Sequence, residues 1–238
     1  IPFKVDKKTA KETLKNFYKG KIFLPRAFSA ENHLEEISGI YVPFWLYSCE
    51  SKGSFSFDAT RTHHYTDGDY DVTETEHYLV LRDGEARFNN IPVDGSSKMD
   101  DAYMDAIEPF DYSAITDFHT DYLPGYAAQT YDEDATACAP RATARVKNTT
   151  IAAIRRTCDY TTLTPRTSKI STTQNSVDYA LLPVWMLTTN WHGKSYHFAI
   201  NGQTGKLIGD LPIDKGRFFS LLAGITIPLG ILLKLFIF

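Results

Sequence analysis

The sequence has 238 residues, with 25 Lys or Arg against 29 Asp or Glu, and a formal net charge of −4. Nucleic-acid binding needs a basic face, so this balance argues against a nucleic-acid partner. The three cysteines, Cys49, Cys138 and Cys158, are widely spaced and contain no C-x-x-C pair. They exclude a disulfide framework or a cysteine zinc site within this chain and favour reduced thiols. The length suits one domain, or two halves sharing a core.

Near the N-terminus the pattern predicts one amphipathic helix. Asp6 is a good N-cap, and Ala10, Leu14 and Phe17 follow at helical spacing on one stripe. Gly20 is expected to end the helix. The helix should therefore bury one face against the rest of the domain.

The first strong strand covers residues 40–47 and resembles residues 181–187 in carrying an apolar Pro-x-Trp pattern. Because it is apolar on every residue, we expect both faces to be covered. The similarity predicts an internal duplication, with halves around residues 40–93 and 181–210. The matched positions are Pro43 and Pro183, Trp45 and Trp185, Gly53 and Gly193, Phe55 and Tyr196, and Phe57 and Phe198.

Residues 55–81 predict a β-hairpin that turns at Asp67-Gly68, a dipeptide favoured in tight hairpins. A two-residue turn at that place pairs Arg61 with Glu74 across the strands, an opposite-charge pair that favours the register. A second turn at Asp83-Gly84 is expected to lead into a third strand over residues 86–93.

The segment from residue 94 to 134 is strongly acidic and predicts a solvated surface that faces partner proteins. A short helix is expected over residues 97–107, and a later helix should have Pro140 in its first turn and end near Cys158. Residues 159–178 are polar and predict one exposed strand plus a loop. The residues proposed for the partner surface are Asp100, Asp101, Asp105, Glu108, Asp111, Asp117 and Asp121.

The C-terminal part of the soluble region predicts a three-stranded meander over residues 181–187, 196–200 and 206–208. Residues 201–205 form its second turn; they lead into a strand rather than a helix, so they are not a phosphate-binding loop. The predicted class is α+β, with antiparallel sheets and flanking helices. The predicted structural anchors are Pro43, Trp45, Pro183, Trp185, Gly202 and Gly205.

The predicted division of the chain is a soluble domain over residues 1–210, a linker over 211–217 and a transmembrane helix over 218–238. The last segment carries one charge, Lys234, and as a helix it would be roughly 31 Å long, which matches the hydrocarbon core of a bilayer. Lys206, Lys215 and Arg217 precede it, so the positive-inside rule predicts a single-pass protein of the cell membrane with its main domain in the cytoplasm.

No catalytic or metal-binding pattern emerges. His63 and His64 are adjacent and face opposite sides of the predicted strand, and His77 lies too far along the hairpin to complete a zinc site. The chain contains no EF-hand spacing, G-x-S-x-G, H-E-x-x-H or Walker motif. We therefore expect no cofactor in this chain and no enzymatic activity.

Several stretches together resemble the bacterial membrane-anchored proteins that contain a TFIIB-type zinc ribbon. These stretches are residues 1–3, 40–45, 93–99, 108–112, 122–126, 182–185 and 201–206. The resemblance covers nearly the whole chain and implies a link to phage-shock or envelope-stress functions. It also implies a zinc ribbon of paired C-x-x-C knuckles N-terminal to Ile1, which this chain does not contain.

These observations favour a membrane-anchored cytoplasmic adaptor or scaffold that binds the lipid bilayer and partner proteins. One alternative is a ligand-sensing module with a pocket between the two Pro-x-Trp hairpins. Another is an unrecognised hydrolase, which would need polar residues clustered in a cleft. The sequence leaves open the identity of the partners and the oligomeric state.

Overall fold

The computed structural model describes the backbone of residues 1–30 and 34–237. The chain forms two units, each built from segments that are far apart in the sequence. Unit 1 contains Ile1–Val42, Met99–Gln129 and Leu181–Phe238, and unit 2 contains Pro43–Lys98 and Thr130–Ala180. The predicted α+β class with antiparallel strands and flanking helices is confirmed.

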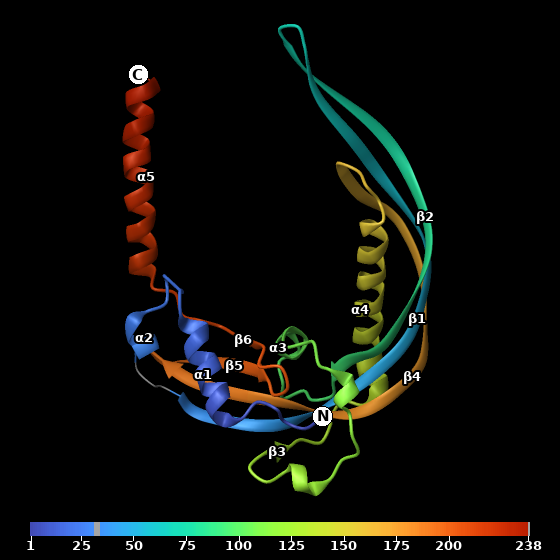
Figure 1. The fold of residues 1–238 in the computed structure, drawn as a ribbon, viewed down its shortest axis with the longest axis vertical. Coiled ribbons are helices and arrows are strands. Elements are labelled where there is room, and N and C mark those ends of the chain that lie inside the picture. Colours follow the sequence, from blue (N-terminus) through green and yellow to red (C-terminus); the bar gives the residue numbers. More distant parts are fainter. Residues whose placement is uncertain (31–33, 238) are drawn as a thin grey trace. The chain divides into compact units, whose positions relative to one another are not determined.

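The strands follow the order β2-β1-β4-β5-β6, with the short strand β3 beside β1 (Figure 1). The pairs β1–β2, β4–β5 and β5–β6 are antiparallel, and β1–β3 is parallel. The bounds are Leu34–Asp67 for β1, Tyr70–Asp94 for β2, Ala127–Ala128 for β3, Thr162–Trp191 for β4, Lys194–Asn201 for β5 and Leu207–Gly209 for β6.

In unit 1 the core forms between helix α1 (Lys7–Tyr18) and the strands β4 and β5. Asp6 caps the helix, its carboxylate accepting a hydrogen bond from the Thr9 amide at 2.7 Å. The buried residues Ala10 and Leu14 then pack, with others of their cluster, against apolar side chains of the strands. These side chains are Trp185, Leu187, Tyr196, Phe198 and Ile200. The predicted helix and the predicted three-stranded meander are both confirmed.

The remaining helices of unit 1 are short, apart from the C-terminal helix α5 (Lys215–Ile237). α2 lies between α1 and β1, and α3, η1 and η2 lie between β2 and β3. Their bounds are Arg26–Ala30 for α2, Asp101–Ala106 for α3, Tyr112–Ala114 for the 3₁₀ turn η1 and Thr120–Tyr122 for the 3₁₀ turn η2.

In unit 2, the long helix α4 (Ala135–Arg156) lies along one face of the ladder formed by β1 and β2 (Figure 1). Its buried residues recur every four positions, so they form one stripe that faces the strands. The stripe consists of Cys138, Ala142, Val146 and Thr150. Strand side chains that share this core are Tyr47, Cys49, Ile91 and Val93.

The predicted start of α4 was wrong. The helix begins at Ala135 rather than next to Pro140, because the Asp134 carboxylate accepts a hydrogen bond from the Ala137 amide at 2.8 Å and caps it earlier. Pro140 therefore lies inside the helix, where its ring nitrogen cannot donate a hydrogen bond to the preceding turn. The predicted end near Cys158 is close to the observed Arg156.

The predicted hairpin exists, but its register differs by two residues. Asp67 pairs with Tyr70, so the loop residues are Gly68 and Asp69, and Arg61 pairs with Glu76 instead of Glu74. Gly68 has a φ of +58°, the conformation that a type II′ turn requires of its first loop residue. A shift of two residues keeps every side chain on its predicted face.

The second predicted turn, at Asp83-Gly84, does not form. Gly84 pairs with Gly53 within the β1–β2 ladder, whose register shifts only between Tyr47 and Cys49, and β2 continues to Asp94. The expected loop within residues 159–178 is likewise replaced by the continuous strand β4. Glycine and polar residues favour chain reversals, but here neighbouring strands hold them in extended conformation.

Candidate functional site

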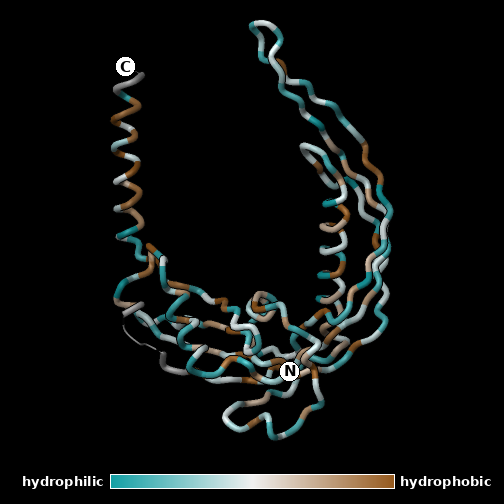
Figure 2. Tube along the Cα trace, viewed as in Figure 1, coloured by the Kyte–Doolittle hydropathy of each residue, from teal (hydrophilic) through white to brown (hydrophobic). Residues whose placement is uncertain are grey.

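Helix α5 is the candidate membrane span of the chain. The segment Lys215–Lys234 is long and apolar enough to cross a membrane, and none of it is buried in the structure. Figure 2 shows hydrophobic residues along most of α5. Large side chains such as Ile225, Ile227 and Ile231 are 57–61% exposed. An exposed apolar surface of this length is typical of a helix that lies in lipid.

The first turn of α5 is attached to unit 1 by specific contacts. The Arg217 guanidinium donates a hydrogen bond to the Leu24 carbonyl at 3.0 Å, and the Asp214 amide donates to the Phe23 carbonyl at 2.7 Å. The rings of Phe23 and Phe218 meet edge to face at 5.5 Å. The helix therefore continues directly from a packed part of unit 1.

This attachment changes the predicted boundary between linker and helix. The helix begins at Lys215, three residues before the predicted position 218, because the Asp214 side chain accepts a hydrogen bond from the Arg217 amide at 3.1 Å. The final residues of the predicted linker are thus helical. The predicted last residue of the span, Phe238, lies outside the described residues.

A pocket of about 600 Å³ lies beside this first turn, on unit 1. The β4–β5 turn contributes Trp191 and Lys194, and the segment that leads into α5 contributes Asp210 and Lys215. The Lys194 ammonium lies over the Tyr196 ring, 5.2 Å from its centroid. This pocket was not predicted, although a tryptophan and a lysine flanking an exposed turn were visible signals.

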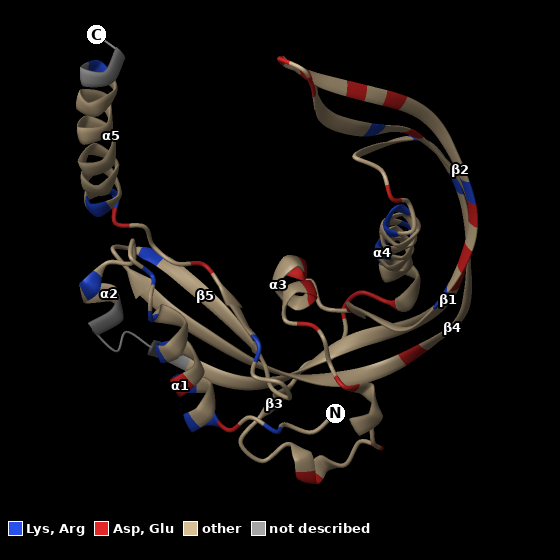
Figure 3. Ribbon diagram, turned by 45° about the horizontal axis from the view of Figure 1, so that its top comes forward, with Lys and Arg blue, Asp and Glu red and all other residues tan. Residues whose placement is uncertain are grey.

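The acidic residues predicted as a partner surface all belong to unit 1, and the structure spreads them over several elements. Asp100 caps α3, which also carries Asp101 and Asp105, and Asp111 caps η1. Figure 3 shows α3 on one side of the strands of unit 1 and the segment of η2 on the other. The structure therefore does not bring the predicted set together as one patch.

Hydrogen bonds fix the conformations of several of these carboxylates. Asp111 accepts from the Ser113 amide at 3.0 Å and from its hydroxyl, and these bonds lower the pKa of the Asp111 carboxyl below its ordinary value. Asp117 and Asp121 are exposed, while Asp105 and Glu108 are half-buried. The carboxylates of the α3 and η1 caps thus stabilise local structure as well as contributing negative charge.

The predicted anchors of unit 1 meet where β4 passes the start of α1. The Trp185 indole donates a hydrogen bond to the carbonyl of Val5, the residue before the helix cap, at 2.8 Å. The Gly202 amide donates to the Pro183 carbonyl at 2.8 Å, and the Gly202 carbonyl accepts from the amides of Lys4 and Val5. We call this arrangement the Trp185 junction.

Unit 2 contains the same set of hydrogen bonds where β1 passes the start of α4. The Trp45 indole donates to the carbonyl of Glu133, the residue before the helix cap, at 2.9 Å. The Gly95 amide donates to the Pro43 carbonyl at 2.9 Å, and the Gly95 carbonyl accepts from the amides of Asp132 and Glu133. We call this arrangement the Trp45 junction.

The two junctions match the predicted pairs of proline and tryptophan but not the rest of the predicted repeat. Gly95 is the counterpart of Gly202, whereas Gly53 lies within a strand and Gly193 lies in a turn with a φ of +76°. The last predicted anchor, Gly205, has a φ of +78° in the turn before β6, a conformation that favours glycine. The structure does not show the predicted match of Gly53 with Gly193.

Among the described residues there is no group of three or more His, Cys, Asp or Glu side chains that could hold a metal ion. His63 lies 3.9 Å from Glu76, and His64 shares a hydrogen bond with Thr73, the residue that it pairs with across the strands. Burial raises the pKa of the Cys49 thiol, which disfavours a reactive thiolate.

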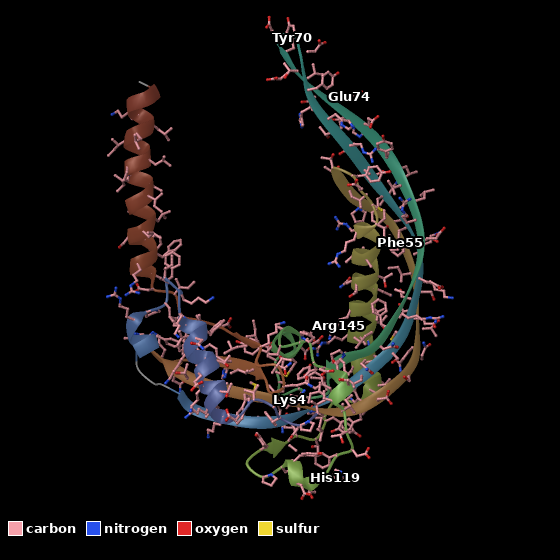
Figure 4. All side chains as sticks on the ribbon, viewed as in Figure 1. Lys4, Phe55, Tyr70, Glu74, His119 and Arg145 are labelled. Carbon is pink, nitrogen blue, oxygen red and sulfur yellow. The ribbon has the colours of Figure 1, made fainter. Side chains whose placement is uncertain are left out.

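Beyond Thr62 the β1–β2 ladder continues as a two-stranded ribbon, residues 62–76, which we call the distal arm. The first residues of β4 lie at the base of the arm. The Thr62 amide donates a hydrogen bond to the Thr161 hydroxyl, and β4 begins at the next residue, Thr162. Figure 4 places the labelled residues Tyr70 and Glu74 near the tip of the arm. Tyr65 and Tyr70 are 51% and 76% exposed.

Comparison with known proteins gives one informative match. The chain is 36% identical over 236 residues to a Bacillus subtilis (strain 168) protein named "Uncharacterized protein YdjG", and the match covers 99% of this chain and 69% of YdjG. No family model matches the chain, and no solved structure matches it. The similarity to YdjG extends over both units and α5.

Proposed function

The chain belongs to the family of Bacillus subtilis YdjG, and from this premise we propose that it is a single-pass membrane protein whose folded units form a cytoplasmic adaptor for partner proteins. The observation that carries the proposal is the exposure of α5. Both units have buried cores without this helix, so its apolar side chains beyond the first turn do not serve the fold. A bilayer would remove them from water, at a gain of about 25 cal/mol for each Å² of apolar surface.

The charges around α5 support the cytoplasmic orientation. Lys215 and Arg217 lie at its first turn, and Lys234 is one turn from the described end (Figure 3). Lys206 and Lys194 add positive charge on the side of the folded units. Short flanking segments rich in Lys and Arg favour the cytoplasmic side, whereas a lysine near a helix end can extend to the interface.

The distal arm supports a role in binding proteins. A two-stranded ribbon is marginally stable alone in water, and its outer edges carry backbone groups that can pair with another strand. Its exposed side chains include the aromatic residues Tyr65 and Tyr70, and aromatic residues are enriched in protein interfaces. The arm therefore offers a partner both an edge and side chains for specific contacts.

The proposal extends to membrane stress through the resemblance to the zinc-ribbon family. In this view a zinc ribbon N-terminal to Ile1 would provide a second binding module, and the chain described here would hold it at the membrane. The acidic residues of α3 and those of the η1–η2 segment would give partner proteins two separate negatively charged contacts.

Site-specific photocrosslinking in living cells tests this function. A photoreactive amino acid replaces Tyr70 at the arm, and a matched variant carries it at Lys11, which is exposed on α1. We expect the chain in the membrane fraction, and one defined protein adduct from position 70 that is absent from position 11.

Comparing a truncated chain with the chain that keeps α5 separates membrane anchoring from partner binding. A chain ending at Asp214 should leave the membrane fraction and lose the adduct. If the chain with α5 intact is found in the soluble fraction, anchoring is wrong. If it is in the membrane but position 70 yields no protein adduct, the arm is not a partner-binding element.

A further inference from the structure

The contacts between α5 and unit 1 determine how close the surface of unit 1 lies to a bilayer that contains α5. The contacts of Asp214 and Arg217 with the segment Phe23–Leu24 attach the first helical turn directly to the folded unit. No flexible spacer separates them, so a membrane that takes up α5 also brings the surface around this turn to the level of the lipid headgroups.

That surface has the composition of a membrane interface. Ile22 and Ile213, on either side of the attachment, are 65% and 66% exposed, and Phe219 is 61% exposed. Lys21 and Lys215 are exposed beside them. Large apolar side chains next to lysines are unfavourable in water, but they suit the boundary between acyl chains and headgroups.

The pocket beside the first turn lies on the same surface. Lys194 and Lys215 contribute two ammonium groups, and Trp191 and Ile213 contribute apolar walls. The carboxylate in the lining, Asp210, already accepts a hydrogen bond from the Tyr103 hydroxyl at 3.2 Å. The two lysines against one aspartate leave the lining with an excess of positive charge.

We propose that this pocket binds the phosphoglycerol headgroup of an anionic phospholipid in the bilayer that α5 spans. The phosphate would lie between Lys194 and Lys215, and the other carboxylate oxygen of Asp210 or the His192 ring would accept from the glycerol hydroxyls. Trp191 lies where interfacial tryptophans are enriched. The inference rests on the membrane span in the proposed function.

A lipid fits these observations better than a free phosphate ion. A small ion would gain from the lysines alone, whereas the pocket lining also includes the exposed apolar residue Ile213, which is two residues before the first residue of α5. A headgroup bound there keeps its acyl chains beside α5. A phosphocholine headgroup would instead place a quaternary ammonium near the two lysines, which repel it.

Fluorescence quenching tests this proposal with the full chain in lipid nanodiscs. The discs contain phosphatidylcholine and phosphatidylglycerol, with bromine on the upper acyl chain of one lipid or the other. We expect brominated phosphatidylglycerol to quench tryptophan emission more strongly at equal mole fraction. Trp191→Phe should remove most of this difference, because Trp45 and Trp185 belong to the junctions.

The lysines are tested by a matched pair of double variants. Lys194→Gln with Lys215→Gln should reduce the preference for phosphatidylglycerol roughly tenfold, since each lysine near an anionic surface contributes appreciably to binding. Lys8→Gln with Lys11→Gln, on exposed positions of α1, removes the same charge and should leave the preference unchanged.

The outcomes distinguish the inference from the proposed function. If the chain does not enter nanodiscs, the membrane span fails, and the lipid site fails with it. If it enters nanodiscs but both brominated lipids quench equally, or both double variants behave alike, the lipid site alone is wrong. Inorganic phosphate added to the buffer should not abolish the quenching difference; if it does, the pocket is a site for free phosphate.

Discussion

The Trp185 junction and the Trp45 junction use the same backbone bonds but differ in the buried polar residue that precedes the junction glycine. Unit 1 has Asn201 before Gly202, and unit 2 has Asp94 before Gly95. Both side chains belong to residues with 0% exposure. Similar backbone geometry is thus combined with a neutral amide in one unit and a carboxylate in the other.

Asn201 is satisfied by backbone groups alone. Its amide nitrogen donates to the carbonyls of Ile107 and Pro109 at 3.0 and 3.1 Å. Its carbonyl oxygen accepts from the amides of Gln203 and Thr204 at 2.9 and 3.0 Å. Both donors and both acceptor sites of the Asn201 amide are used, so the Trp185 junction requires no charged side chain at this position.

Asp94 depends instead on a charged partner. Its carboxylate lies 2.8 Å from the Arg141 guanidinium, which is on α4, and its backbone carbonyl accepts from the Cys138 thiol. A buried carboxylate is stable only when its charge is compensated. The comparison shows that the buried residue of the Trp185 junction is held by neutral hydrogen bonds to backbone groups, two of them on the distant residues Ile107 and Pro109, whereas that of the Trp45 junction links the strand to a helix through an ion pair.

The largest effect should come from breaking that ion pair. Arg141→Met leaves the Asp94 carboxylate buried opposite an apolar side chain and should lower the free energy of unfolding by about 3–5 kcal/mol. Urea unfolding of the full chain in detergent, followed by circular dichroism, measures the loss. Hydrogen exchange should show that α4 loses protection before α1.

The double variant Asp94→Asn with Arg141→Met is the control, because it places in unit 2 the residue type found in unit 1. It should recover a substantial part of the lost stability. Equal losses for the single and double variants would show that the arginine acts through packing rather than through its charge.

The next largest losses of stability should come from replacing the junction tryptophans, and Trp185 should lose more than Trp45. Trp185 is 3% exposed and contacts the rings of Phe3 and Tyr126 at 5.3 and 5.7 Å, whereas Trp45 is half-buried. Trp185→Phe loses a buried hydrogen bond and leaves a cavity, so it should cost about 2–4 kcal/mol, and Trp45→Phe about 1–2 kcal/mol. The same unfolding measurement ranks them, and a reversed order would contradict the burial argument.

The helix caps beside the junctions should give the smallest effects. Asp6→Ala and Asp134→Ala each remove a side-chain acceptor from the first turn of α1 or α4. Each should speed amide exchange in that turn by less than about tenfold without affecting the other helix. Exchange that rises in both helices would show that the caps support more than their own turn.

The cap of α1 also has a defined pH dependence. Hydrogen bonds from Thr9 hold the pKa of the Asp6 carboxyl below its ordinary value of 3.8. The folded pKa is depressed, so the stabilisation is present above pH 3.8 and is lost as the pH falls through the folded value. The difference between the native chain and Asp6→Ala should therefore disappear in acid.

Local signals in the sequence predicted local structure well. The cap at Asp6 and the stripe of Ala10 and Leu14 define α1 without any knowledge of the rest of the chain. The hairpin was also predictable, but its register depended on which residue takes a positive φ. The dipeptide Asp67-Gly68 cannot show this, since glycine can occupy either loop position.

The junctions and the pocket depend on contacts that sequence patterns do not encode. The Trp45 indole bonds to a carbonyl 88 residues away, so the Pro-x-Trp pattern alone could not identify its partner. The pocket joins Lys194 from one turn with Asp210 and Lys215 from another segment. Only the strand pairing brings them together, and strand pairing is set by long-range packing.

The interleaved order of the segments has a consequence for synthesis. The Ile1 nitrogen donates a hydrogen bond to the carbonyl of Leu181, and α1 packs against β4 and β5, so these contacts of unit 1 form only after the ribosome has made the intervening residues. At roughly 5–20 residues per second this interval lasts about 10–40 s. Throughout it the nascent N-terminal helix can be reached by chaperones and proteases, and no single cut in the gene separates one unit from the other.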